Sequence, residues 1–378
     1  MVLGLLNRPY VHPAECIIKV NQIPIIDLYP LVTEVTVEAT RDRFSEATIT
    51  FASPVDETGR WQVADDPRLE TWADITIEAD FQEGREQILR GVILDVTPAY
   101  PANAGETTVT LTARDNSARL DREVSQKVWG IEPVGTADAL ILLEMAASAG
   151  LIVDPTSGPG QIGVVAAQNS SDVAFLMQRA LMNGYELIFS SNTIYFGPMR
   201  VDLAPQPTIM VYAGQRTNCR SFSAPTEADR RRSIAYAKRD ANGDPGGLAT
   251  VTSDLPQMGL TPGQGRGLAL RDHVGFLDRE TVPDDMQSEG LAQGLANLGD
   301  MNIRAEGELD GSLYGHVLRV GEPVEVDGTG ERYSGTYYVD TVTHRFDMSG
   351  YSQHFSLMRN ALGRLPGGAL GGALSAVL

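Results

Sequence analysis

Cysteine and positive charge are both scarce in this sequence. The 378 residues include two cysteines, Cys16 and Cys219, and neither belongs to a CxxC pair, which argues against a disulfide framework and against a structural zinc site. Thirty basic side chains against 49 acidic ones give a net charge of -19, which disfavours a surface that neutralises nucleic-acid phosphates. We therefore expect two small buried thiols and no sequence-specific nucleic-acid binding.

Long apolar runs are missing as well. No run approaches the roughly 18 to 20 residues that span a bilayer. The opening MVLGLLNRPYV has no cationic region before its short apolar run, so it does not resemble a secretory signal. These features predict no membrane span and a protein that is made and kept in the cytosol unless a larger assembly exports it. The 42% hydrophobic and 21% charged content predicts a folded chain, and its length predicts two or three domains.

Motifs that carry chemistry are also few. There is no HExxH, no GxSxG and no P-loop lysine, and the glycine string at 263–267 follows turn residues rather than a strand, which predicts a loop. The acid pairs Asp65-Asp66 and Asp284-Asp285 suit a turn and a helix start, and the basic run 230–232 suits the entry to a strand. We expect no catalytic residue, no cofactor, no metal site and no enzyme activity.

Short runs that alternate apolar and polar residues dominate the first 115 residues. Such alternation is typical of strands with one buried face, and 38 glycines and 21 prolines punctuate the chain between its runs. The expected strands are 34–39, 47–51, 74–79, 89–96 and 107–113. This segment predicts one all-β unit over residues 1–115.

Helical periodicity replaces the alternation after residue 115. We expect a helix that Thr136 caps and that runs through 149, with a buried stripe of Leu140, Leu143 and Ala147. A second helix should span 172–183 between a Ser171 cap and Gly184, with a stripe of Val173, Leu176, Met177 and Leu181. The strings YELIF and TIYFG then predict a hairpin. Together these features predict an α/β unit over residues 116–200.

The region from 201 to 302 mixes strand, loop and helix signals. Alternation runs from about 220 to 238, and a stretch rich in Gly, Pro and Asp follows to about 282. We expect a helix over about 284–301, which carries Leu291, Leu295 and Leu298. Its glycines weaken it by roughly 1 kcal/mol each. A close approach of another backbone would explain Gly290, Gly294 and Gly299.

Strands return near the end of the chain, at 317–320, 323–326, 335–346 and 351–359. A turn at 347–350 makes the last two a hairpin that pairs Phe346 with Tyr351 and Val342 with Phe355. In this register His344 shares the apolar face and His354 lies on the polar face. The two histidines therefore should not share a metal ion.

Several local strings, in this order, resemble a known family. The first string is LRGVILDVTPAYPANAGETTVTLTARDNSARLDRE, which is followed by a capped helix and then by SSDVAFLMQRALMNGYELIFSSNTIYFGP. The last is the C-terminal LRVGEPVEVDGTGERYSGTYYVDTVTHRFDMSGYSQHFSLMRNALG. Together they resemble the late-control protein D family of contractile-tail baseplate hubs. The resemblance covers about 34–240 and 284–362. It extends to the hub part of the VgrG spike proteins of type VI secretion.

The resemblance implies a mainly β fold with α+β insertions. Two tube-like β-barrel domains are expected, at 1–115 and at 201–240 with 303–362, beside the α/β middle domain at 116–200 and a helix-containing insertion at 241–302. The implied function is a non-enzymatic structural hub, a homotrimer that adapts a hexameric tail tube to a separate trimeric spike. Baseplate wedge and tape-measure proteins would be its neighbours. It would lie in the baseplate of a virion tail assembled in the host cytoplasm. If it surrounds an axial channel, the net charge of -19 leads us to expect acidic side chains on the channel-facing surfaces, the alternative being acid spread over the exterior for solubility.

The final segment, 363–378, is rich in Gly and Ala and has no charge after Arg364. A solvated tail would not need its apolar side chains, so we expect it to bind the spike or a neighbouring hub subunit through Leu365, Leu370, Leu374, Val377 and Leu378. The alternative is a disordered terminus with no role. Two alternatives for the whole chain stay open: a tail-tip protein that binds a host surface or glycan, and a tail enzyme that degrades cell wall.

Overall fold

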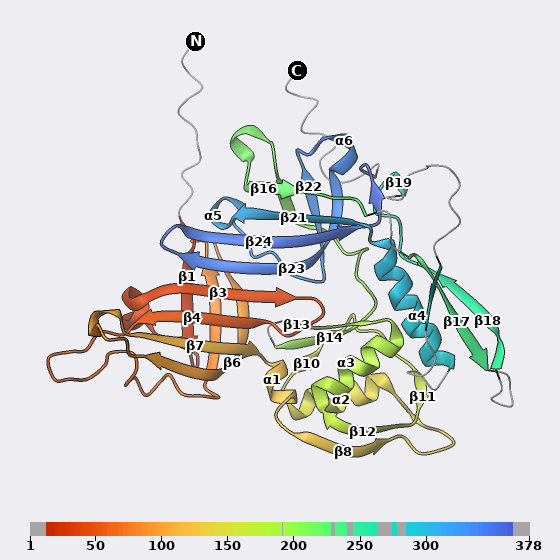
Figure 1. The fold of residues 1–378 in the computed structure, drawn as a ribbon, viewed down its shortest axis with the longest axis horizontal. Helices are drawn as coiled ribbons and strands as arrows, with labels where there is room; N and C mark the ends of the chain where they lie inside the picture. The colour runs from red at the N-terminus through yellow and green to blue at the C-terminus, as the bar shows by residue number, and fades with distance from the viewer. Residues whose placement is uncertain are drawn as a thin grey trace, which may run out of the picture.

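One large antiparallel sheet forms the body of the computed structural model, which describes residues 13–190, 192–227, 231–239, 245–262, 274–277 and 285–365 (Figure 1). The mainly β prediction is confirmed. In spatial order the sheet contains β16 (Cys219–Ser223), β21 (Ile303–Asp310), β24 (Gly350–Arg359), β23 (Gly335–Asp347), β3 (Val32–Thr40), β4 (Glu46–Ala52), β7 (Thr108–Asp115), β6 (Arg85–Ala99), β5 (Asp74–Asp80), β1 (Glu15–Val20) and β2 (Ile23–Pro24). Beside β23 it adds β22 (Pro323–Asp327) and, parallel to β22, β15 (Gln206–Met210).

Alternation buries one face of each central strand. Under β3, β4 and β7 the core contains Val35, Ile49 and Leu111, and a second cluster under β21, β23 and β24 contains Ile303, Val339 and Leu357, all six fully buried. Burial of such a side chain stabilises the fold by roughly 1.5 to 3 kcal/mol. All five strands expected between residues 34 and 113 are present, several of them longer at the ends.

The C-terminal hairpin has the predicted register. Phe346 pairs with Tyr351 and Val342 with Phe355, while His344 is buried and His354 is exposed. The strand expected at 317–320 is wrong. There the amide of Leu318 donates to the side chain of Gln353 and the amide of Arg319 to that of Gln206, so side chains replace a strand ladder.

The middle unit packs two helices against short sheets. These helices are α2 (Asp138–Ser148) and α3 (Asp172–Asn183). Its strands are β8 (Val124–Trp129), β9 (Thr136–Ala137), β10 (Ile152–Val153), β11 (Ile162–Val164), β12 (Ala166–Ser171), β13 (Glu186–Ser190) and β14 (Thr193–Gly197), after a short α1 (Ser117–Leu120). The expected hairpin is confirmed as β13 and β14, and α3 has the predicted bounds and ends at Gly184 with φ +66°.

The predicted helix faces in this unit are partly wrong. Helix α2 buries Ile141, Leu142 and Met145, whereas Leu140 is 60% and Leu143 56% exposed. Apolar residues lie on both sides of α2, so periodicity alone could not select the buried one. In α3, Leu181 is exposed as well. Neither expected N-cap side chain bonds to the first turn of its helix. The residue before α2 is Ala137 rather than Thr136, and the Ser171 hydroxyl before α3 donates to Asp121 instead.

Glycines of α4 (Asp285–Asp300) contact two other segments, as the sequence predicts. A Cβ on Gly290 would lie 2.2 Å from the carbonyl oxygen of Met182, and one on Gly294 would lie 2.7 Å from Cα of Gly184. A Cβ on Gly299 would lie 1.9 Å from the oxygen of Arg231. Of the three leucines on this helix, Leu295 is exposed and Leu298 packs against an apolar cluster, while the fully buried side chains are those of Ala292 and Ala296. Small residues let α4 approach α3 closely.

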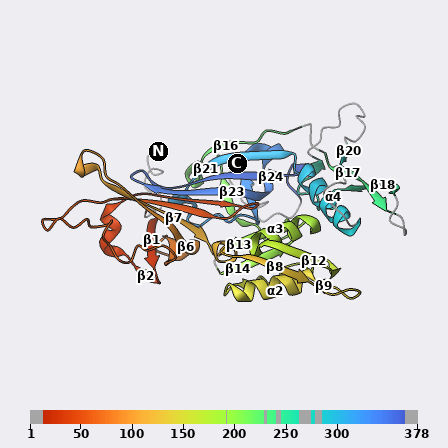
Figure 2. The ribbon, with the colours of Figure 1, turned by 60° about the horizontal axis from the view of Figure 1, so that its bottom comes forward.

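A small sheet lies beside α4, at the end of the molecule away from β1 (Figure 2). It contains β17 (Ser233–Arg239), β18 (Pro245–Thr252) and β20 (Val274–Phe276). The remaining elements are β19 (Thr261–Pro262), β25 (Ala361–Leu362), α5 (Gly311–Tyr314), α6 (Gly330–Tyr333) and the 3-10 turns Ile26–Leu31, Ala104–Glu106 and Gly214–Arg216. None of the described helices is long and apolar enough to cross a membrane.

A largely buried charge cluster joins the middle unit to β3 and β23 of the large sheet. Arg41, just after β3, donates from Nη1 to Glu186 on β13 at 3.1 Å and from Nε to Asp340 on β23 at 3.0 Å. The Tyr338 hydroxyl donates to the other oxygen of Glu186 at 2.7 Å, and the Arg304 Nη1 donates to Asp340 at 3.0 Å. Burial raises the pKa of Glu186, and Arg41 opposes that rise. This junction positions β13 against the sheet.

Candidate assembly surface

The eight strands from β16 to β6 divide into two halves with the same strand order. In chain order each half has four strands, and the spatial order is first, second, fourth, third in both: β3-β4-β7-β6 and β16-β21-β24-β23. The halves meet where β23 pairs antiparallel with β3, from Thr341 opposite Thr40 to Phe346 opposite Val35. The chain therefore contains the same sheet topology twice, side by side (Figure 1).

Irregularities in the strand ladders align the two halves residue by residue. Between β6 and β7 the register shifts at Leu94, and between β23 and β24 it shifts at Asp340. A second pair of shifts lies at Thr33 in β3 and at Arg220 in β16. Each pair occupies the same place in its half, so the halves match in bulges as well as in strand order.

The face of this sheet that points away from the two cores is polar. The pairings align the side chains in rows that cross both halves; one row contains Glu308, His354, Thr343, Glu38, Glu46 and Arg114, and another contains Asp310, Ser352, Arg345, Thr36, Thr48 and Thr112. Threonine and serine suit a pleated surface that is only half buried. Such a continuous polar face on a long sheet is a candidate lining or contact surface.

Carboxylates outnumber arginines on this face. Its arginines are ion-paired: Arg345 with Glu34 and Asp347, at 3.0 and 2.9 Å. Arg114 pairs with Glu46 at 2.9 Å, and Arg220 contacts two carboxylates on β21. Glu38 and Glu306 are exposed on the same face. The face is therefore acidic, and its arginines are already neutralised.

The residues considered for chemistry have structural roles or lie apart. Asp66 holds Arg68 in a turn, Asp285 begins α4, and His316 contacts Glu86 at 2.7 Å. Within the described ranges, no group of three or more His, Cys, Asp or Glu residues could hold a metal ion. The glycine string at 263–267, Asp284, His12, His273 and Arg230 lie outside the described residues.

Both cysteines are free thiols. Cys219 is buried, and Cys16 is half buried and packs on the first core. Burial raises the pKa of Cys16 to about 12 and that of Cys219 to about 11, so both thiols stay protonated at neutral pH. The prediction of small apolar packing residues fits these positions.

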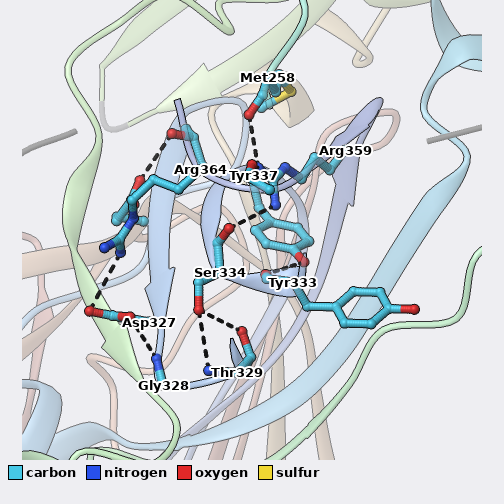
Figure 3. A network of polar contacts seen from close by, with 12 residues as sticks. Met258, Asp327, Gly328, Thr329, Tyr333, Ser334, Tyr337, Arg359 and Arg364 are labelled. Carbon is cyan, nitrogen blue, oxygen red and sulfur yellow. Dashed lines mark hydrogen bonds and ion pairs between the residues drawn. The ribbon is translucent and has the colours of Figure 1, made fainter. Parts of the chain in front are cut away.

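The root of the C-terminal segment is fixed by a buried polar network (Figure 3). Fully buried Arg359 donates to the carbonyl oxygens of Ser334 at 3.2 Å, of Met258 at 3.0 Å and of Gly363, and its guanidinium lies 5.0 Å from the Tyr337 ring. One side chain thus ties three separate chain segments together.

Arg364 adds an ion pair at the same root. Its Nε donates to Glu325 at 3.0 Å, and its Nη2 lies 3.5 Å from Asp327, both on β22. Leu365, the next residue, is 44% exposed. Leu370, Leu374, Val377 and Leu378 lie outside the described residues. Sequence reasoning missed Arg359 and Glu325, because a lone arginine in a strand pattern gives no sign that it is buried.

Comparison with family models assigns the chain. Residues 13–233, more than half of it, match the model described as the Alg8 N-terminal domain. The chain belongs to the Alg8 N-terminal domain family. The match spans the first half of the sheet, the middle unit, β15 and β16, and ends where β17 begins. Comparison with curated proteins gives no match.

Solved structures share the fold over nearly the whole chain. The 43 kDa tail protein of prophage MuSo2 from Shewanella oneidensis has 14% identity and a TM-score of 0.65, covering 92% of this chain and 98% of its own. A tail protein from Neisseria meningitidis has 10% identity and a TM-score of 0.61, covering 92% and 97%. An E. coli component of the type VI secretion system, described as similar to the T4 bacteriophage tail proteins gp27 and gp5, has 11% identity and a TM-score of 0.53, covering 92% and 79%. The chain therefore has a phage-tail-like fold, and membership of the late-control protein D family stays a prediction.

Proposed function

We propose that this chain is a structural baseplate hub of a contractile phage tail or a phage-like injection particle, and that it acts without enzymatic activity. The observation that carries the proposal is the repeated four-stranded half, joined through β23 and β3 into one sheet with one polar face. A chain that contains two like units suits contact with a ring of identical subunits. The fold shared with phage tail proteins and with a type VI secretion component supports the same role.

In this proposal three copies form a closed ring. Three chains with two like halves each present six similar units, which match a hexameric tail tube on one side, while the threefold axis matches a trimeric spike on the other. Baseplate wedge and tape-measure proteins are the expected further neighbours. The acidic sheet face is proposed to line the axial channel, where it would repel a passing polyanion rather than bind it.

The C-terminal segment is the proposed contact to the spike or to a neighbouring hub subunit. Arg359 and Arg364 hold its root in place, so the segment leaves the second half at a defined point beside β22. The apolar side chains Leu365, Leu370, Leu374, Val377 and Leu378 would be buried in that contact.

The test measures the assembly directly. The mass of the purified full chain should correspond to three copies of 40.8 kDa, and immobilised chain should retain a purified tail tube protein and a purified spike from the same particle. A chain that stays monomeric at every concentration and retains neither partner would refute the hub proposal.

A further inference from the structure

A cleft lies between the first half of the sheet and the middle unit. Its lining comes from the turn before β5, from β6, from α1 and the turn after it, and from the end of α2: Trp72, Val92, Arg119, Arg122, Ser148 and Ala149. The cleft has a volume of about 320 Å³, which lies at the lower end of the range for ligand pockets. A space of this size suits a small ligand or one unit of a longer chain.

Trp72 has an unusual backbone conformation. Its φ is +68°, in the left-handed region that favours glycine and that bulky residues rarely adopt. Hydrogen bonds fix the position, because the N–H of Trp72 donates to the carbonyl oxygen of Ile93 at 2.7 Å and the N–H of Ile93 donates to that of Ala73 at 3.0 Å. The indole is nevertheless 45% exposed. The chain thus keeps a large apolar ring at a strained and open position, which points to a function for that ring.

Arg122 brings a positive charge without a carboxylate partner. Its guanidinium lies over the Trp72 ring, 5.2 Å from the ring centre. Within the described ranges, the Arg122 side chain forms no ion pair and no hydrogen bond. Arg119 differs, since it donates to the carboxylate of Asp74 and, at 3.2 Å, to the side chain of Asn116. The cleft therefore contains one uncompensated cation in a chain with a net charge of -19.

The end of α2 adds hydrogen-bond acceptors to the same cleft. The last carbonyl groups of a helix have no helical N–H partners, and this end carries partial negative charge. In the part of the chain that the structure describes, no backbone amide donates to the carbonyl oxygens of Ser148 or Ala149. The Ser148 hydroxyl already donates to the carbonyl oxygen of Met145 at 2.7 Å. This part of the lining suits a ligand whose hydroxyl groups donate.

We propose that the cleft binds an acidic carbohydrate, a chain of hexuronic acid units. The carboxylate of one unit pairs with Arg122, the C–H face of its ring packs on the Trp72 indole, and its hydroxyls donate to the carbonyl oxygens at the end of α2. A neutral sugar would leave Arg122 without a partner, and inorganic phosphate has no apolar face for the indole. This binding activity is separate from the proposed hub function and does not depend on it.

Calorimetric titration of the full chain with trigalacturonic acid tests the proposal. We expect saturable binding that is tighter by about tenfold or more than that of neutral maltotriose or of inorganic phosphate at the same ionic strength. Arg122→Gln should weaken the binding of trigalacturonic acid by about tenfold or more. Trp72→Gly should weaken it similarly and keep the fold, because glycine adopts a φ of +68° without strain. Thermal unfolding of both variants checks that they are folded.

Arg332→Gln is the matched control. Arg332 is also exposed and lies over an aromatic ring, 5.5 Å from the centre of Tyr333, but it belongs to α6 and does not line the cleft. Its variant should bind trigalacturonic acid within about twofold of the unchanged chain. An equal loss in Arg332→Gln, or equally tight binding of phosphate, would show unspecific attraction of anions and overturn the proposal. Absence of saturable binding, or full binding by Trp72→Gly, would overturn it as well.

Fluorescence gives a second measurement of the same event. Trigalacturonic acid should change the tryptophan emission of the unchanged chain and leave that of Trp72→Gly constant, since Trp129 is buried and Trp61 does not line the cleft. The result is independent of the mass and partner measurements that test the hub. A trimer that binds no acidic sugar would overturn this inference and leave the hub proposal intact, whereas a monomer that binds it would do the reverse.

Discussion

Replacement of Arg41 should weaken the whole chain, because Arg41 is the cation between all three parts of the fold. Its side chain is 12% exposed and that of Glu186 3%. Arg41→Met would leave the Tyr338 hydroxyl as a hydrogen-bond donor to the Glu186 carboxylate but remove the cation that contacts it. Removal of one member of a buried ion pair costs about 3 to 5 kcal/mol, because the other charge stays buried without compensation. The expected loss of unfolding free energy lies in that range.

The loss should depend on pH in a defined direction. Burial raises the pKa of Glu186 above its unfolded value, and without Arg41 this pKa rises further. A raised folded pKa of an acid means that the folded state binds more protons, so stability is lost as pH rises and is recovered as pH falls. The defect of Arg41→Met should therefore be larger at pH 8 than at pH 5.

Urea unfolding followed by tryptophan fluorescence measures both effects, since Trp61 and Trp72 report on the first half and Trp129 on the middle unit. The matched control is Arg43→Met, which removes an arginine that is 78% exposed and should change the unfolding free energy by less than about 0.5 kcal/mol. The double variant Arg41→Met with Glu186→Gln should be more stable than Arg41→Met alone. A loss below about 1 kcal/mol, or no recovery in the double variant, would refute the reasoning.

Three further outcomes are expected. Gly290→Ala should destabilise the chain by about 1 to 3 kcal/mol in thermal unfolding, because its Cβ would meet the backbone oxygen of Met182. The control Gly247→Ala, with no atom within 4 Å of the added Cβ, should change the stability little. Burial lowers the pKa of His344 from 6.5 to about 3, so between these pH values the unfolded state binds more protons than the folded state. The free energy of unfolding should therefore fall as pH drops from 6.5 toward 3. His344→Phe should flatten this pH dependence when unfolding is measured between about pH 4.5 and 7. Deletion of 366–378 keeps Arg364 and its ion pairs, so thermal stability should be unchanged while the amount of spike co-purified falls; unchanged spike capture would contradict the proposed role of the segment.

Local patterns predicted local structure well. Alternation identified the strands around Ile49 and Leu111, and one turn set the register of the C-terminal hairpin, because hairpin partners are close in sequence. Choice of a helix face was less successful. Helix α2 has leucine on both sides, so periodicity could not select the side that is buried. The buried cluster around Arg41 could not be predicted, since its members come from residues far apart in the chain.

The internal repeat shows why the assembly surface needs the structure. In the first half, strands one and two are neighbours in sequence; in the second half, β16 ends at Ser223 and β21 begins at Ile303, with the small sheet and α4 between them. Alternation fixes which side chains share a face in each strand, but it does not identify the partner of a strand. The repeat becomes visible only when strand order and bulges are compared.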